Sequence, residues 1–97
     1  MTTFKCVEHR LRRLCRTWKV TVHIVDPDDI DGDLGECEYV GKKAACIRIA
    51  RNQSEQSRVE SLLHEFAHVL AGPCKRDHGR KWGIAYAKCY CCAMRVR

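Results

Sequence analysis

The residues of this chain best suited to chemistry are two histidines and a glutamate at a defined spacing. His64, Glu65 and His68 form an HExxH motif inside a run of residues that favours a helix. Because positions i and i+4 lie on one face of a helix, both imidazoles can bind the same metal ion. Glu65 can then take a proton from a water molecule that the metal activates. The motif predicts a hydrolytic zinc site with a third protein ligand and an open fourth position.

The third zinc ligand is expected downstream of the motif. The metzincin pattern places a Gly three residues and a His six residues after the second histidine. This chain has Ala71 and Cys74 there, which excludes that pattern. The remaining candidates are His78, Asp77 and Cys74. We favour His78, because the ten residues after His68 allow the chain to turn back over the helix, and because imidazole suits a catalytic zinc.

The two segments taken together resemble the SprT-like zinc metallopeptidases, which include the Spartan DNA–protein crosslink proteases. In that family an HExxH motif is followed, after a variable turn, by an HGxxW/F element whose histidine is the third zinc ligand. Here these elements are residues 64–68 (HEFAH) and 78–82 (HGRKW). The resemblance covers roughly residues 44–92, and the paired motif carries it, because HExxH alone is weak evidence.

The resemblance implies one zinc ion per chain, bound by His64, His68 and His78, with Glu65 as the general base of a metalloendopeptidase. It implies a single SprT-like domain over residues 1–97 with a zincin-like fold, similar to the small stand-alone proteins of bacteriophage genomes. Two features of larger family members are missing. The chain lacks the paired CxxC motifs of a C-terminal zinc ribbon, and it lacks the DNA-binding elements of the Spartan proteins.

The pattern along the chain predicts an α+β domain. An N-terminal helix with apolar residues at steps of three or four is followed by an alternating strand at 19–25. Two further strands, at 35–40 and 44–50, flank a tight turn, and we expect all three strands to form an antiparallel sheet. The HExxH helix begins near Ser54 or Ser57 and stops at Gly72 and Pro73. A last helix, capped by Asp77, follows.

Two aromatic residues of the last helix are expected to support the metal site. Trp82 and Tyr86 lie one helical turn apart, so both can pack behind the metal ligands. Tyr86 could instead reach the oxyanion that forms during peptide hydrolysis. His23, within the first strand, is expected to be structural rather than a ligand.

Charge is distributed unevenly. The chain has 18 Lys and Arg residues against 12 Asp and Glu residues, and seven of those acidic residues lie between Asp26 and Glu38, where no basic residue occurs. A basic body favours polyanionic partners, with DNA first. A stripe of basic residues on the N-terminal helix could contact phosphates or simply be a solvated helix face. Its members are Lys5, Arg12, Arg13 and Arg16. The acidic segment does not match a calcium-binding EF-hand loop, so we expect an exposed loop.

Eight cysteines in 97 residues would suit a secreted disulfide scaffold, but the N-terminus lacks the apolar stretch of an export signal. We therefore expect reduced thiols and a cytoplasmic protein, in the host cytoplasm if the protein is phage-encoded. A second metal held by Cys74 and the Cys89, Cys91 and Cys92 cluster is a weaker alternative. No apolar run is long enough to span a membrane.

Three functions are compatible with these patterns. The first is a zinc metallopeptidase that cleaves a protein or peptide substrate, including DNA-associated proteins. The second is a nucleic-acid-binding module that uses zinc for stability and does not turn over a substrate; a fourth protein ligand such as Cys74 would favour it. The third is a regulatory HExxH protease that cleaves one repressor protein. The HGxxW element argues against this third function.

Overall fold

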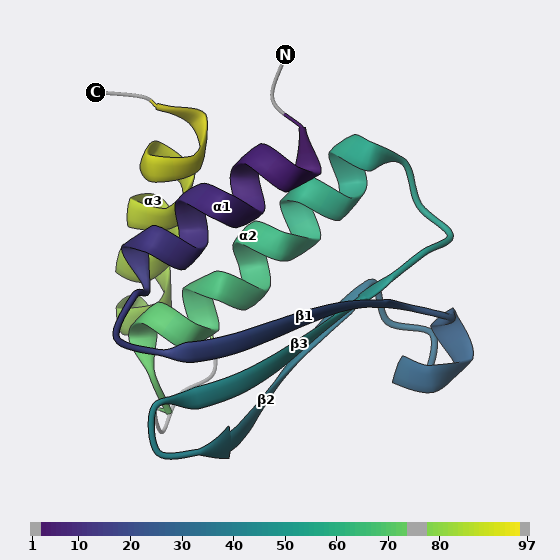
Figure 1. Ribbon diagram of the computed structural model, residues 1–97, viewed down its shortest axis with the longest axis horizontal. Helices are drawn as coiled ribbons and strands as arrows, with labels where there is room; N and C mark the ends of the chain where they lie inside the picture. Colours follow the sequence, from purple (N-terminus) through teal and green to yellow (C-terminus); the bar gives the residue numbers. More distant parts are fainter. Residues whose placement is uncertain (1–2, 74–77, 96–97) are drawn as a thin grey trace.

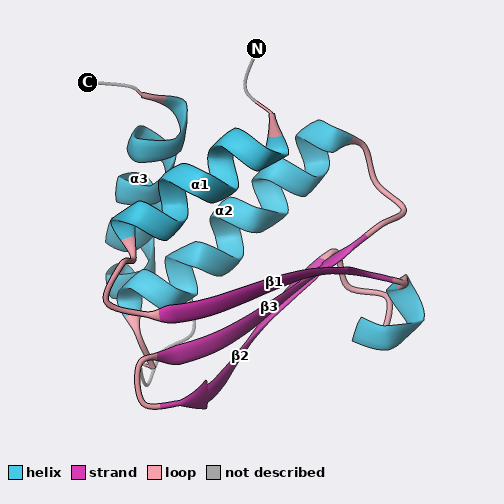
Figure 2. Cartoon of the chain, viewed as in Figure 1, coloured by secondary structure: helices cyan, strands magenta, loops and turns pink. Residues whose placement is uncertain are grey.

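The computed structural model describes residues 3–73 and 78–95, which form a helical layer packed on a three-stranded sheet. In chain order the elements are α1 (Phe4–Leu14), β1 (Lys19–Val25), the 3-10 helix η1 (Pro27–Ile30), β2 (Gly35–Gly41), β3 (Ala44–Ala50), α2 (Glu55–Ala71) and α3 (Arg80–Met94). Figure 1 and Figure 2 show α1, α2 and α3 on one face of the sheet, with α2 next to the strands and η1 beyond the end of β1. The expected α+β class and element order are confirmed. None of the helices in the described part is long and apolar enough to cross a membrane.

The sheet is mixed, so the expected fully antiparallel sheet is wrong for one of its two strand pairs. β2 and β3 form the expected antiparallel hairpin, with Cys37 opposite Ile47, but β1 pairs with β3 in parallel, with Val22 opposite Ile47. The strand order is β1-β3-β2. β3 takes the centre because Ala45, Ile47 and Ile49 on it are buried. β2 carries two glutamates in a short strand, which suits an edge.

The ends of α2 fix how the HExxH residues are presented. The helix is capped by Ser54, whose Oγ accepts a hydrogen bond from the backbone N–H of Ser57 at 3.1 Å. It ends at Gly72, whose φ of 76° favours glycine. Leu62 and Phe66 on its apolar face are fully buried. This burial sets the rotation of the helix about its axis and therefore the direction of the residues between them.

α1 and α3 complete the helical layer. On α1, the guanidinium of Arg10 donates to the backbone carbonyl of Ala93 on α3 at 2.5 Å, which joins the two ends of the chain. α3 begins after Gly79. Asp77, which was expected to cap this helix, lies outside the described residues. His78 immediately precedes Gly79, the N-cap residue of α3, so the position of this helix determines where that histidine can reach.

Candidate metal centre

Three imidazoles meet beside the C-terminal half of α2. Nε2 of His78 lies 2.9 Å from Nε2 of His64 and 3.1 Å from Nε2 of His68. Three nitrogens bound to one tetrahedral zinc at its usual bond length would lie about 3.3 Å apart, close to these separations. Within the described residues, this is the one group of three or more His, Cys, Asp or Glu side chains whose ligand atoms converge. The three histidines therefore lie close enough to bind a metal ion.

His78 is held over α2 by the start of α3. Its φ of 56° lies in the left-handed region, which costs a non-glycine residue about 1–2 kcal/mol and must be stabilised by its surroundings. The Trp82 ring lies 4.9 Å from the ring of His78 and 4.9 Å from that of His64, measured between centroids. The indole N–H of Trp82 also donates to the backbone carbonyl of His64 at 3.3 Å. Trp82 thus ties α3 to the HExxH helix.

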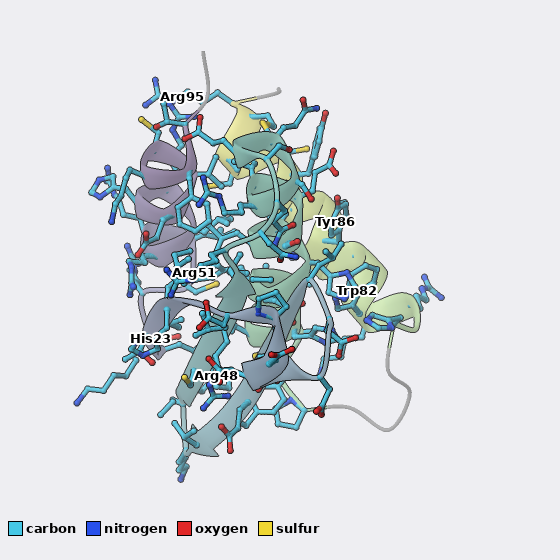
Figure 3. All side chains as sticks on the ribbon, turned by 90° about the vertical axis from the view of Figure 1, so that its right-hand side faces the viewer. His23, Arg48, Arg51, Trp82, Tyr86 and Arg95 are labelled. Atoms are coloured by element: carbon cyan, nitrogen blue, oxygen red, sulfur yellow. The ribbon has the colours of Figure 1, made fainter. Side chains whose placement is uncertain are left out.

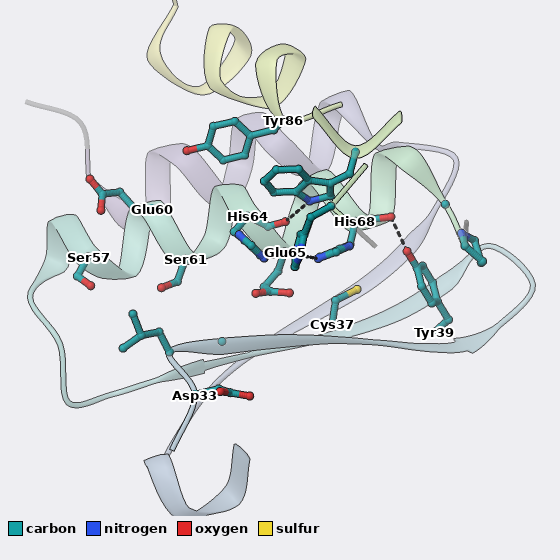
Figure 4. Close-up of a pocket in the computed structure, with 16 residues that line it drawn as sticks. Asp33, Cys37, Tyr39, Ser57, Glu60, Ser61, His64, Glu65, His68 and Tyr86 are labelled. Carbon is teal, nitrogen blue, oxygen red and sulfur yellow. Dashed lines mark hydrogen bonds between the residues drawn. The ribbon is translucent and has the colours of Figure 1, made fainter. Parts of the chain in front are cut away.

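Glu65 is buried next to the three imidazoles, with 6 % of its surface exposed. Its carboxylate lies against β2 at Gly35 (Figure 4). A Cβ added at Gly35 would lie 3.3 Å from Oε2 of Glu65 and 3.2 Å from Cδ1 of Ile49. Gly35 therefore leaves the space that the carboxylate occupies, and a larger residue there would crowd it.

Two residues of β2 that sequence analysis did not assign to the site also face it. The Tyr39 hydroxyl donates to the backbone carbonyl of His68 at 2.6 Å and so fastens β2 to the end of α2. Burial, and then the carboxylate of Glu65, raises the pKa of the Cys37 thiol to about 12. Without a metal this thiol is protonated at neutral pH, and its sulfur is not one of the ligand atoms that converge in the described part of the chain. Gly35, Cys37 and Tyr39 alternate along the strand and therefore lie on one of its faces. This alternation could have predicted from the sequence that they share a face.

The metal centre opens into a groove between α2, β2 and α3 with a volume of about 910 Å³. Trp82 and Tyr86 line it from α3, with their ring centroids 5.2 Å apart. Figure 4 shows the Tyr86 hydroxyl directed along α2 toward Glu60 rather than toward the imidazoles. Burial, and then the Glu60 carboxylate, raises the pKa of this hydroxyl, so it stays protonated at neutral pH.

The N-terminal basic residues lie outside this groove. Lys5, Arg13 and Arg16 are exposed on α1 or just after it. Arg12 differs from them, because its guanidinium donates to Oε2 of Glu8 at 2.9 Å and 3.0 Å and also to a backbone carbonyl of β1. In the described part of the chain, three cations of the stripe are therefore exposed, whereas the guanidinium of Arg12 is bound by other groups of the protein.

The other ligand-type residues do not build a second centre in the described part of the chain. His23 is exposed on β1, and Figure 3 shows it far from Trp82 and Tyr86. Burial raises the pKa of Cys15 to about 11 and that of Cys89 to about 12, which keeps both thiols neutral. The described cysteines are free thiols. Cys74, the cysteine considered as a ligand, lies outside the described residues. Among those residues, the side chains of segment 26–38 form no converging group.

No protein-family model, curated protein or solved structure matches this chain. The resemblance to the SprT-like family therefore depends on residues 64–68 and 78–82. The site itself depends on the geometry that those two segments adopt.

Proposed function

We propose that this protein is a zinc metallopeptidase of the SprT-like type, with a minimal zincin-like domain. The observation that carries the proposal is the convergence of His64, His68 and His78 beside the buried carboxylate of Glu65. Three imidazoles suit zinc, and a carboxylate next to them suits proton transfer. The open groove gives a peptide access to both. One zinc ion per chain fits this set of ligands.

The residues around the centre have separate roles in the proposed reaction. When bound, zinc would supply a Lewis acid that polarises the scissile carbonyl and acidifies a coordinated water molecule. Glu65 accepts a proton from the attacking water and delivers it to the leaving amine. Burial against Gly35 restricts the Glu65 carboxylate, which favours a fixed geometry for that transfer. Trp82 positions His78, and Tyr86 supports Trp82 by ring contact.

β2 is the element best placed to bind an extended substrate. It is an edge strand that, in the described part of the chain, pairs only with β3. Its residues Gly35, Cys37 and Tyr39 line the groove beside the metal centre. A peptide can add to such an edge through backbone hydrogen bonds, which bind many sequences and leave the side chains to set the specificity.

The proposal predicts zinc-dependent proteolysis of an unstructured protein. Casein incubated with the zinc-loaded protein should be cut into discrete fragments, because its extended chain can lie along β2 without prior unfolding. A zinc chelator should abolish cleavage, and added zinc should restore it. Fragments are identified by mass spectrometry. Cleavage that persists in excess chelator would contradict a metallopeptidase.

A DNA-associated protein is the substrate class that the charge distribution favours. The exposed cations Lys5, Arg13 and Arg16 lie on a different surface from the groove. Binding of DNA there would leave the groove open to a protein on the same DNA. This proposal requires that the protein bind DNA through its phosphates rather than through its sequence.

We expect weak, sequence-independent DNA binding that falls steeply as the salt concentration rises, because phosphate contacts release counterions. A salt titration with single- and double-stranded DNA measures this. Changing Arg13 and Arg16 together to Glu should reduce the affinity by about tenfold or more at low salt and lower the salt slope. Lys81→Glu combined with Lys88→Glu, which reverses two exposed charges on α3, is the matched control. No binding at low ionic strength would leave the basic surface with a role in solubility only.

A further inference from the structure

We propose that one end of the sheet is a binding surface for single-stranded DNA, where bases stack on Trp18 and Tyr39 and neighbouring cations contact the phosphates. The inference rests on the proposed function for the role of the bound DNA, but it does not depend on peptidase activity. Figure 1 shows that the connection from α1 to β1 and the turn from β2 to β3 lie at the same end of the sheet. The residues of this basic aromatic surface are Arg16, Trp18, Lys19, Tyr39, Lys42 and Lys43.

Backbone and ring contacts hold these two segments together, although they lie far apart in the sequence. The backbone N–H of Lys19, the first residue of β1, donates to the carbonyl of Lys43 at 2.8 Å. The centroids of the Trp18 and Tyr39 rings are 5.9 Å apart. The ammonium of Lys43 lies 5.2 Å from the centroid of the Trp18 ring. Two aromatic rings and a cation therefore form one contiguous cluster.

The charge of the basic aromatic surface is positive. Its four cations are all exposed. The segments that carry them, 16–19 and 39–43, contain no Asp or Glu. The ion pairs found in the described residues use cations that lie outside both segments. The four cations are therefore available to the phosphates of a nucleic acid.

The acidic residues around η1 lie at the other end of the sheet. η1 follows β1, and Figure 1 shows it beyond the end of that strand. A strand of seven residues spans about 20 Å, which exceeds the Debye length of about 8 Å at physiological ionic strength. The two glutamates of β2 are already paired with Arg48. The acidic segment therefore leaves the basic aromatic surface largely unscreened.

The aromatic rings favour unpaired bases over a duplex. Tyr39 has 36 % of its surface exposed, and Trp18 is half-buried. Bases in a duplex stack on one another, so a single strand is the form that can place bases on side-chain rings. Such stacking accepts every base, which agrees with binding that does not depend on sequence. The Lys43 ammonium that lies over the Trp18 ring can move to a phosphate when a base replaces it.

The basic aromatic surface lies next to the groove. Tyr39 belongs to both, because it lines the groove and its hydroxyl donates to the backbone carbonyl of His68 at 2.6 Å. A DNA strand bound here would pass the end of the groove that is closest to His68. A protein attached to that strand would then be held close to the metal centre, which would favour it over a free protein as a substrate.

The test measures DNA binding without peptide cleavage. A fluorescein-labelled oligo(dT) of about 15 nucleotides, a duplex of the same length and a matching oligo(U) are titrated into the protein, and binding is followed by fluorescence anisotropy. We expect oligo(dT) to bind about fivefold more tightly than the duplex. Lys42→Glu combined with Lys43→Glu should weaken oligo(dT) binding about tenfold or more at low salt. Trp18→Leu should remove the preference for the single strand.

Two controls separate this surface from general charge and from the peptidase. Lys81→Glu combined with Lys88→Glu reverses two exposed charges on α3 and should lower the affinity much less. The Lys42→Glu/Lys43→Glu protein should cleave casein at the wild-type rate, because neither lysine lines the groove. Absence of casein cleavage in the wild type would count against the peptidase alone, since the binding measurements need no turnover.

A photochemical crosslink tests the base contacts in the wild-type protein, whether or not Trp18→Leu folds. An oligo(dT) that carries 5-iododeoxyuridine is irradiated in the complex, and the crosslinked residue is identified by mass spectrometry. We expect the crosslink on Trp18 or Tyr39. Crosslinks confined to other residues, equal affinity for oligo(dT) and the duplex, or an affinity that the lysine reversals do not lower would overturn the surface. Tighter binding of oligo(U) than of oligo(dT) would assign it to RNA and overturn the proposal for DNA.

Discussion

If the proposed zinc site is correct, the His78→Ala protein is expected to bind zinc much more weakly than the wild type. His64 and His68 alone offer two imidazoles from one helix, whereas a catalytic zinc site uses three protein ligands. Changes in residues that only orient a ligand already lower metal affinity by about 10–100-fold, so removal of a ligand should lower it by at least about 100-fold. The measurement is elemental analysis after dialysis against a weak chelator, with circular dichroism to follow the helical content.

The controls for this prediction are the other histidines. His64→Ala and His68→Ala should lower zinc binding to a similar extent, because each removes one of the three converging Nε2 atoms. His23→Ala should keep it, since His23 is exposed on β1. Full retention of zinc by His78→Ala would remove this residue from the ligand set and direct attention to Asp77 or Cys74.

The local part of the site could be predicted from the sequence because it depends on helix geometry alone. Residues i and i+4 of a helix share a face, so the pairing of His64 with His68 needed only the prediction of a helix. The apolar residues of that helix, such as Phe66, fixed the face that is buried. The position of His78 was also anticipated, although its left-handed φ of 56° and its contact with Trp82 were not.

The remainder of the site depends on strand pairing, which residue pattern alone does not determine. The alternation of residues predicted the three strands. It did not predict whether β1 pairs with β2 or with β3, because that depends on which strand is buried most under the helices. The parallel pairing of β1 with β3 leaves β2 at the edge. In this arrangement Gly35 and Tyr39 lie beside α2, where Gly35 leaves room for Glu65 and the Tyr39 hydroxyl donates to the His68 carbonyl.

The basic stripe shows a second limit of periodicity. Lys5, Arg12, Arg13 and Arg16 were grouped because they share a helical spacing. In the structure, Nη2 of Arg12 lies 2.9 Å from Oε2 of Glu8, which is one turn earlier on α1. Such an i,i+4 pair is visible in the sequence, but the added bond from Arg12 to the Val20 carbonyl depends on how the chain turns into β1.

The Glu65→Gln protein should keep its fold and its zinc and lose peptide hydrolysis. Glutamine has nearly the same shape as glutamate, so it can occupy the space beside Gly35. The ligands of the proposed metal are the three histidines, so zinc content should equal that of the wild type. An amide cannot accept the proton of the attacking water, and loss of a general base typically lowers the rate by about 10²–10⁴-fold.

Three measurements on this protein separate a missing base from a damaged site. Circular dichroism reports the fold, elemental analysis reports the zinc, and casein cleavage followed by mass spectrometry reports the rate. Glu55→Gln makes the same chemical change at an exposed position on α2 outside the groove and should cleave at the wild-type rate. If Glu65→Gln also cleaved at that rate, with a chelator-sensitive activity, proton transfer would have to be assigned to another group. The burial of Glu65 beside the imidazoles would then serve only to position the helix against β2.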